Sequence, residues 1–411
     1  MSKPTLPHAS LDRFEVRDGC LVVGGIALPQ LATVIGRTPF YAYDRALIDR
    51  RIDELRRALP QEVALHYAMK ANPMPAVVAH VARKVDGIDV ASGGELRVAL
   101  DAGVSAQDIS FAGPAKSHAE LMQAVAAQVL INVESFREVD ALAAIGRSLA
   151  MHPRVAIRIN PDFELKSSGM KMGGGPKQFG VDAEEVPALL ERMRAGGFAF
   201  EGFHLYAGSQ NLHAESICEA QRKSFELATR LAASDCDTIR HLNLGGGFGI
   251  PYFPGEVPLD LAPIAANLHD LVARAAVAMP RARLVIELGR YIVGEAGIYV
   301  CRIVDRKLSR GHVFLVTDGG LHHHLAASGN FGQVIRRNYP IAIGNRMNEA
   351  AVEESSVVGP LCTPLDLLGD RVRLPAGRPG DLVVVFQSGA YGASASPQRF
   401  LSHPPPTEAL V

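Results

Sequence analysis

The feature that most constrains the fold of this chain is an alternation of short apolar runs with longer amphipathic stretches, between about residue 60 and residue 290. The runs are rich in β-branched or aromatic residues and are bounded by Gly, Pro, Asn or Asp, which is typical of buried strands. Eight of them follow one another: VALHY from Val63, IDVAS from Ile88, ISFAG from Ile109, VLINV from Val129, VAIRI from Val155, GFHLY from Gly202, HLNLG from His241 and LVIEL from Leu284.

The stretches between these runs carry apolar residues at three- and four-residue spacing, as in AELMQAVAA from Ala119 and EVPALLERMRA from Glu185. This spacing predicts helices. Eight strands that alternate with helices predict a parallel (β/α)8 TIM barrel, and an open doubly wound sheet is the alternative.

The chain changes character on both sides of this region. After about residue 295, the segments GIYVCRIVDRKL, HVFLVTDG and DLVVVFQSGAYG indicate strands with few helices between them. CLVVGGIALPQLATVIG, before the barrel, also has strand character. We therefore expect residues 38–292 to form the barrel, and residues 1–37 and 293–411 to form a β-rich domain built from both chain ends.

Charge and cysteine content limit the class of protein. Lys+Arg 42 against Asp+Glu 43 give a formal net charge of -1, which argues against a nucleic-acid partner. We expect no signal peptide, and the sequence has no uninterrupted apolar stretch long enough to cross a membrane. The cysteines are scattered without a C-x-x-C pair, so we expect reduced thiols, no zinc site and a cytoplasmic location. They are Cys20, Cys218, Cys236, Cys301 and Cys362.

A barrel of this kind places catalytic groups just past the carboxyl ends of its strands. Lys70 follows the first strand in HYAMKANP. Beside Ala and Met, its amine would be partly desolvated, which lowers the pKa of a lysine and favours Schiff-base chemistry. An ordinary surface lysine is the alternative.

Two further patterns follow the last two strands. LNLGGGFG, from Leu242 to Gly249, offers bare backbone N–H groups that could bind a phosphate, although a glycine run can also be a plain tight turn. IELGRY places Glu287 and Arg290 three residues apart. The arginine could bind a phosphate and the carboxylate a protonated ring nitrogen, while a structural salt bridge is the alternative.

Taken together, these motifs resemble one family. HYAMKANP, FAGPAKS, INVES, AGSQ, GGGFG, E-x-GR, GPLC and GAYG occur in this order. The sequence resembles the fold type III decarboxylases that depend on pyridoxal 5′-phosphate (PLP), which include diaminopimelate and ornithine decarboxylases. The resemblance extends from about Thr38 to Leu401 and implies an alanine-racemase-like barrel.

The resemblance also implies roles for single residues. Lys70 resembles the lysine that holds PLP, and Tyr206 occupies the position that stacks on its ring. Ser209, Gly246, Gly247, Gly289, Arg290 and Tyr391 resemble the phosphate-binding residues, with Glu287 on the pyridine nitrogen. Cys362 in GPLC resembles the residue that returns a proton to the substrate carbon; a buried small hydrophobe is the other reading of this cysteine. In the family, Cys362 and Tyr391 would come from the neighbouring chain, so a homodimer with shared active sites is expected.

Glu287 bears on the type of reaction. A carboxylate raises the pKa of the ring nitrogen, which keeps the ring able to accept electrons when CO2 leaves. In the resembling alanine racemases, an arginine is expected at the ring nitrogen, where it would make the ring a weaker electron acceptor. Glu287 therefore favours decarboxylation over racemisation.

Several positions depart from the diaminopimelate pattern. Tyr206 stands in place of a stacking histidine, Thr363 in place of an acidic residue, and the arginine–proline segment after Asp318 is missing. SGMKMGGGPKQFG, from Ser168 to Gly180, replaces the usual motif near the fifth strand. The segment His322–His324 could suggest a metal, but neighbouring positions cannot all face one ion, so we expect an exposed or substrate-facing loop.

These departures, with GMKMGGGPKQFG and GPLCTPLD, resemble a branch found with acyl-carrier-protein pathways and exosortase gene clusters. One member decarboxylates glutamyl groups tethered to a carrier protein. We therefore expect a decarboxylase of an amino acid, and an aminoacyl group tethered to an acyl carrier protein is the favoured substrate. The alternatives are a diaminopimelate decarboxylase of lysine synthesis and a non-catalytic regulatory protein of the same fold.

Overall fold

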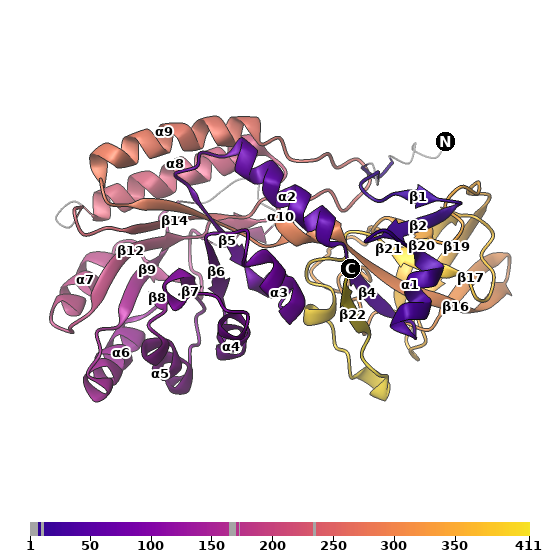
Figure 1. The fold of residues 1–411 in the computed structure, drawn as a ribbon, viewed down its shortest axis with the longest axis horizontal. Helices are drawn as coiled ribbons and strands as arrows, with labels where there is room; N and C mark the ends of the chain where they lie inside the picture. Colours follow the sequence, from indigo (N-terminus) through magenta and orange to yellow (C-terminus); the bar gives the residue numbers. More distant parts are fainter. Residues whose placement is uncertain (1–6, 10–11, 164–169, 172, 233–235) are drawn as a thin grey trace. The chain divides into compact units, whose positions relative to one another are not determined.

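The structure is a computed structural model that describes all of residues 1–411 except residues 1–6, 10–11, 164–169, 172 and 233–235. The chain forms two compact units (Figure 1). The barrel unit comprises Arg51–Gly249 and Leu259–Gly289, and the β-rich unit comprises Met1–Arg50, Ile250–Pro258 and Arg290–Val411. The division at residues 38 and 292 that we expect from the sequence stays a prediction.

Eight parallel strands close the barrel. They are β5 (Ala64–Ala68), β6 (Gly87–Val90), β7 (Ile109–Phe111), β8 (Leu130–Val133), β9 (Arg154–Asn160), β12 (Ala199–Leu205), β14 (His241–Gly246) and β15 (Arg283–Leu288). Each strand pairs with the next, and β15 pairs with β5. The eight apolar runs of the sequence coincide with these strands, so the predicted barrel is confirmed and the open sheet is excluded. A short ninth strand, β11 (Val181–Asp182), pairs with β9.

Helices lie around the barrel sheet, and α8 and α9 run side by side along it (Figure 1). Serine side chains begin three of the helices by accepting a backbone N–H of the first turn, as in the capping box of Ser117 and Glu120. The helices are α2 (Arg45–Ala58), α3 (Pro75–Val81), α4 (Gly93–Asp101), α5 (His118–Ala127), α6 (Phe136–Leu149), α7 (Val186–Arg194), α8 (Ala214–Leu231) and α9 (Ala262–Ala278).

The β-rich unit joins both ends of the chain in one sheet, as the sequence predicts. Strand β4 (Phe40–Tyr43), near the start, pairs with the long strand β16 (Gly297–Ser309) and with the C-terminal strand β22 (Thr407–Leu410). The rest of the sheet has the order β18-β21-β16-β17-β19-β20. These strands are β17 (His312–Thr317), β18 (Ile341–Ile343), β19 (Glu353–Val358), β20 (Leu367–Leu374) and β21 (Leu382–Val385).

Smaller elements complete this unit. Strands β1 (Val16–Arg17), β2 (Cys20–Val23) and β3 (Ile26–Ala27) form a separate sheet, followed by helix α1 (Leu28–Ile35). The short helix α10 (Arg290–Val293) begins directly after the barrel strand β15.

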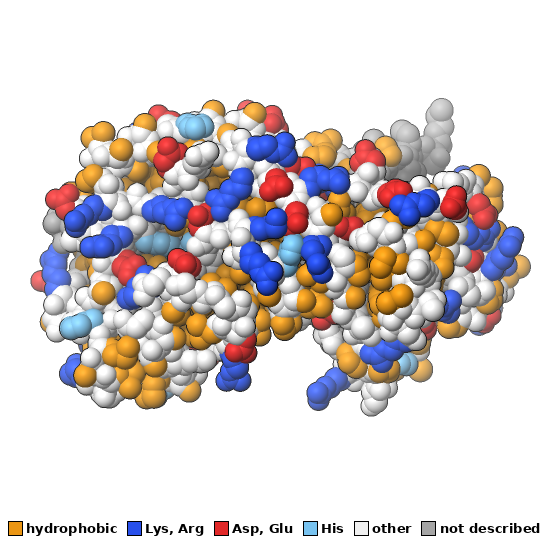
Figure 2. Space-filling view, in the orientation of Figure 1, with side chains coloured by type: hydrophobic (Ala, Val, Ile, Leu, Met, Phe, Trp, Pro, Cys, Tyr) orange, Lys and Arg blue, Asp and Glu red, His pale blue; other side chains and the backbone are white. Residues whose placement is uncertain are grey.

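The surface fits the balanced charge of the sequence. Basic and acidic side chains are interspersed on the face that Figure 2 shows. Across the described residues, no helix combines the length and the apolar character that crossing a membrane requires. The five cysteines are free thiols.

Candidate active site

Lys70 lies where the sequence predicts, at the carboxyl end of the first barrel strand. It follows β5 in the short 3-10 turn Met69–Ala71. Met69 and Ala71 are buried, whereas Lys70 is exposed. The expected partial desolvation of the amine is therefore not found, because the turn directs only its neighbours into the core. Lys70 Nζ lies 5.1 Å from the centroid of the Tyr206 ring, so the structure brings these two site residues together.

Glu287 is buried near the end of β15 and has two polar neighbours. Asn243 Nδ2 donates a hydrogen bond of 3.0 Å to Glu287 Oε2. His204 Nε2 lies 3.1 Å from the same oxygen, at ion-pair distance, though without the direction of a good hydrogen bond. Burial alone would raise the pKa of Glu287, but the charge and contact of His204 outweigh it, so the pKa lies well below the ordinary value. Glu287 is therefore a carboxylate at neutral pH.

The glycine run at the end of β14 packs against the segment that carries Ser209. A Cβ atom at Gly246 would overlap the carbonyl oxygen of Glu287, and one at Gly247 would overlap that of Gly208. Gly247 also has a φ of +74°, a conformation that favours glycine. Asn211 N–H donates to the Gly247 carbonyl at 2.9 Å. Only glycine allows this close approach, which brings the expected phosphate-binding residues Ser209, Gly246 and Gly247 together.

Gly289 performs a similar role at the end of β15. A Cβ atom there would lie 2.7 Å from the carbonyl oxygen of Ala68 and 2.8 Å from the Cβ of Ala71. The absence of a side chain lets the end of β15 approach the turn that carries Lys70.

Arg290 and Tyr391 lie together in the β-rich unit. Arg290 Nη1 donates a 2.8 Å hydrogen bond to the Tyr252 hydroxyl, and its Cζ lies 4.5 Å from the Tyr391 ring centroid. Tyr391 has a φ of 54°, which is rare for a residue with a side chain. Within its own chain Tyr391 packs against Arg290, and its expected contribution to the site of a neighbouring chain stays a prediction. Arg290 Nε is buried and has no hydrogen-bond partner within the described part of the chain.

Cys362 is exposed on a loop of the β-rich unit. Asp366 holds this loop: its Oδ2 accepts the Leu361 N–H at 2.8 Å and its Oδ1 accepts the Leu321 N–H at 2.6 Å. The alternative of a buried small hydrophobe is therefore wrong for Cys362, because the loop directs the thiol outward.

The histidine segment His322–His324 contradicts the expectation of an exposed loop. The three side chains are at most 1% exposed. Nitrogen Nε2 of His323 lies 2.9 Å from the Pro404 carbonyl oxygen, and that of His324 lies 2.8 Å from Ser388 Oγ. Burial lowers the pKa of all three. The turn packs against buried parts of the β-rich unit, so these histidines are neutral core residues. No cluster suited to a metal occurs among the described residues.

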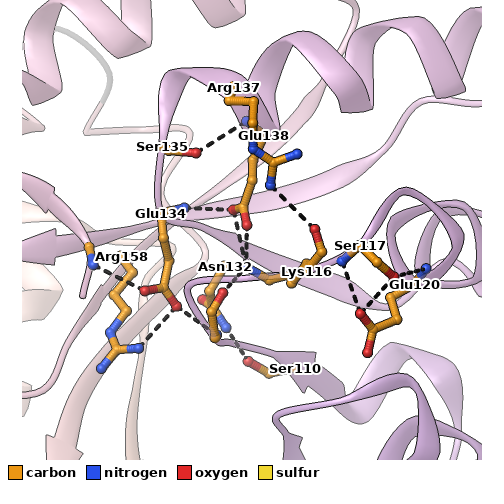
Figure 3. Close-up of polar contacts among 12 residues, drawn as sticks. Ser110, Lys116, Ser117, Glu120, Asn132, Glu134, Ser135, Arg137, Glu138 and Arg158 are labelled. Carbon is orange, nitrogen blue, oxygen red and sulfur yellow. Dashed lines mark hydrogen bonds and ion pairs between the residues drawn. The ribbon is translucent and has the colours of Figure 1, made fainter. Parts of the chain in front are cut away.

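A buried polar network fixes the loops that carry the FAGPAKS and INVES motifs (Figure 3). Lys116 Nζ donates to the Gly113 carbonyl oxygen at 2.7 Å and lies 3.1 Å from Glu138 Oε2. Glu134 accepts from Arg158 Nη1 at 3.0 Å and from the Gly113 N–H at 2.6 Å. These contacts join β9 to the segments that follow β7 and β8, so they tie together three neighbouring strands at the mouth of the barrel.

The remaining branch motif is only partly described. Residues 168, 169 and 172 of SGMKMGGGPKQFG lie outside the described residues. Within the described part, Glu134 Oε2 accepts the Gly180 N–H at 3.0 Å, and Asn160 Nδ2 donates to the Gly175 carbonyl oxygen at 2.9 Å.

Sequence reasoning missed three residues: His204, Asn243 and Tyr252. The two-residue period of a strand could have revealed His204, because positions 204 and 206 point to the same side. Asn243 lies inside the run HLNLG, where a polar residue among buried ones is a signal. Tyr252 follows the glycine run in FGIPYFPGE, and its contact with Arg290 could not be read from spacing.

The described groups fit the chemistry of PLP. An exposed amine on Lys70 suits an aldehyde, a buried carboxylate suits a ring nitrogen, and glycine amides with an arginine suit a phosphate. Lys70, Tyr206, Ser209, Gly246, Gly247, Glu287 and Gly289 lie in the barrel unit, and Arg290, Tyr391 and Cys362 lie in the β-rich unit.

Comparisons with known proteins agree with this chemistry. The family model described as pyridoxal-dependent decarboxylase, pyridoxal binding domain, matches residues 45–294. The chain is 40% identical over 379 residues to L-glutamyl-(BtrI acyl-carrier protein) decarboxylase of Niallia circulans, covering 91% of this chain and 88% of the relative. It is 33% identical over 404 residues to diaminopimelate decarboxylase of Aquifex aeolicus, covering 97% and 92%.

A solved structure agrees over the whole fold. The crystal structure of diaminopimelate decarboxylase from Helicobacter pylori complexed with L-lysine has a TM-score of 0.82 and 29% identity, and the match covers 93% of this chain and 94% of that one. The barrel, the β-rich unit, the motifs and these matches lead to one conclusion: the chain belongs to the pyridoxal-dependent decarboxylase family of fold type III.

Proposed function

We propose that the protein decarboxylates an amino acid whose side-chain carboxyl is tethered to an acyl carrier protein, with PLP as cofactor. The main support for a tethered substrate is the loop that contains Cys362. This loop offers no free carboxylate to the distal amino group of a free diamino acid. The relative at 40% identity, named for a glutamyl group on a carrier protein, supports the same substrate class.

In this proposal each site residue has one task. Lys70 would hold the cofactor through its aldehyde carbon, and Tyr206 would lie against the cofactor ring. Ser209, Gly246, Gly247, Gly289, Arg290 and Tyr391 bind the phosphate. Glu287 keeps a proton on the ring nitrogen. When bound, PLP supplies an electron sink for the pair left behind as CO2 departs.

Cys362 completes the reaction. The bond between Cα and the carboxylate breaks, CO2 leaves, and the electron pair on Cα takes a proton from Cys362 Sγ. We propose that this thiol comes from the second chain of a homodimer, so that each active site is shared. We place the enzyme in the cytoplasm, where such a thiol stays reduced.

The chemistry decides where the tether is attached. PLP enzymes of this kind act on an α-amino group, and the leaving carboxylate must be free. A carrier can therefore hold the substrate only through its side-chain carboxyl. A tether also supplies binding energy away from the reacting centre, which lowers the demand on contacts with the side chain itself.

The substrate loop supports this view over the diaminopimelate alternative. Thr363 stands where diaminopimelate and ornithine enzymes carry an acidic residue. The carboxylate of the same loop, Asp366, is 3% exposed and accepts the N–H groups of Leu321 and Leu361. A free diamino acid would find no carboxylate here for its distal ammonium. The loss of one charged hydrogen bond costs about 1.5–3 kcal/mol, or roughly tenfold to over a hundredfold in affinity.

A non-catalytic regulatory protein is the alternative from another class. Such a protein has no need for Lys70, Glu287, Arg290, Cys362 and Tyr391 together, and this chain retains all five.

The test compares a matched series of substrates. We would measure initial rates of CO2 release from free glutamate, its side-chain pantetheine thioester, and a glutamyl-loaded carrier protein, with free diaminopimelate, ornithine and lysine beside them. The proposal expects the rate to rise along the glutamyl series and to stay low for the free diamino acids. Efficient release from diaminopimelate, with none from the loaded carrier or the thioester, would restore the lysine-pathway alternative.

A further inference from the structure

His204 contacts the most important carboxylate of the candidate site, and none of the roles above uses it. It lies on β12, is 2% exposed, and its Nε2 is 3.1 Å from Glu287 Oε2. Asn243, on the neighbouring strand β14, donates to the same oxygen at 3.0 Å. Glu287 Oε1 has no hydrogen bond among the described residues. Two side chains therefore hold one oxygen and leave the other available.

The strand order places this contact inside the barrel. Strand β14 separates β12 from β15, so His204 and Glu287 meet across the interior and not as neighbours in the sheet. His204 and Tyr206 are two residues apart and therefore face the same side, and the Tyr206 ring lies 5.1 Å from Lys70 Nζ. His204 thus lies one layer below the residue that we assign to the face of the cofactor ring.

We propose that His204 is a positioning residue for the cofactor nitrogen: with Asn243 it fixes Glu287 Oε2 so that Oε1 is directed to the ring nitrogen of PLP. The inference rests on the proposed function only in assigning Glu287 to that nitrogen. It does not depend on which amino acid is decarboxylated.

The energetics of burial explain why such a partner is needed. A carboxylate removed from water is stable only when its oxygens accept hydrogen bonds or face a cation. Besides His204, the charges of Lys70 and Arg158 also lower the pKa of Glu287. His66 is ion-paired with Asp89 at 3.3 Å and is not bonded to Glu287. Of these groups only His204 lies at contact distance from Oε2, so it alone can set the orientation of the carboxylate together with Asn243.

The test compares two substitutions of His204 for which the proposal predicts opposite results. H204F keeps a planar ring and removes the nitrogen that contacts Oε2, whereas H204Q keeps a polar nitrogen at the end of a side chain of similar length. H204F should weaken PLP binding to the apo-protein about tenfold to a hundredfold, which corresponds to a misdirected charged hydrogen bond. It should also shift the pH titration of the absorbance of the bound cofactor. H204Q should restore most of both properties, and kcat should fall in H204F with little change in KM.

A double-mutant cycle shows whether His204 acts through Glu287. In an E287Q background the carboxylate is gone, so H204F should add no further loss of PLP affinity. A matched control is H241F, which removes another barrel histidine, on β14, whose ring packs 6.0 Å from His66. H241F should leave PLP affinity and absorbance unchanged.

Two results would overturn the proposal. One is an unchanged PLP dissociation constant in folded H204F. The other is an equal loss of affinity from H204F in the wild-type and E287Q backgrounds, which would indicate an independent packing role. If H204F does not fold, H204N takes its place. The shorter side chain of asparagine should not contact Oε2, so H204N should also weaken PLP binding. These measurements need no substrate, so a failure of the carrier hypothesis would leave them intact.

Discussion

Lys116 provides a stringent test of the network that holds the mouth of the barrel. Its side chain and that of Glu138 are 1% and 0% exposed, with Nζ 3.1 Å from Oε2. Burial lowers the pKa of Lys116 against the opposing effect of Glu138. Replacing Lys116 by Met keeps the volume of the side chain and removes its charge.

The expected loss of stability in K116M follows from the contacts that Glu138 keeps. In K116M, Glu138 keeps the Glu134 N–H as a donor at 2.9 Å but loses its cation. Removing one partner of a buried pair costs about 3–5 kcal/mol. In a domain of about 150–250 residues, 1 kcal/mol shifts Tm by roughly 2–4 °C. The barrel should therefore melt roughly 6–20 °C lower.

Differential scanning calorimetry would measure this shift beside two companion variants. K116M/E138M replaces the whole pair by apolar side chains and should recover most of the loss. R192M breaks the pair of Arg192 and Asp140, whose side chains are 54% and 52% exposed, and should lower Tm far less than K116M because water screens this pair. If K116M melts no lower than R192M, or if the double variant is no better than K116M, the ion pair does not stabilise the barrel as argued.

Three further predictions concern the candidate site. K70A should lose the visible absorbance of the bound cofactor, and borohydride reduction of the wild-type protein should attach the cofactor to the peptide containing Lys70; an unchanged adduct in K70A would assign it to another lysine. Mixing inactive K70A with inactive C362A subunits should restore part of the activity, because one mixed site is intact at both positions; no recovery after confirmed subunit exchange would exclude shared sites. Glu287 has a folded pKa below its ordinary value of 4.5, so its stabilising effect is present above about pH 4.5 and is lost as pH falls below that. The difference in unfolding midpoint between wild type and E287Q should stay constant from pH 7 to 5 and shrink in more acidic buffer, and a difference that grows there would contradict the direction of the shift.

The barrel could be predicted from the sequence because its strands are short, apolar and separated by turn residues. All eight runs, from VALHY to LVIEL, became strands of the closed sheet. The short strands β10 (Met170–Lys171), β11 and β13 (Gly208–Ser209) were not predicted. Two residues are too few to show a period, so only the folded backbone reveals them.

The site was predictable only in part, for reasons of burial and distance. The motifs located Lys70, Glu287 and the glycine run, since each lies at the carboxyl end of a strand or directly after it. They did not show that His204 contacts Glu287, because that contact joins strands separated by β14. The histidines 322–324 were expected in an exposed or substrate-facing loop, because neighbouring positions cannot all face one metal ion, yet they are buried, and hydrogen bonds to Pro404 and Ser388 satisfy two of them.

The most direct test of the proposed function is the intact mass of a glutamyl-loaded carrier protein after incubation with the enzyme and PLP. The proposal predicts that the carrier loses the mass of one CO2 and keeps its thioester, and that K70A leaves the mass unchanged. A carrier of unaltered mass, with CO2 released from free diaminopimelate by the same preparation, would contradict a tethered substrate.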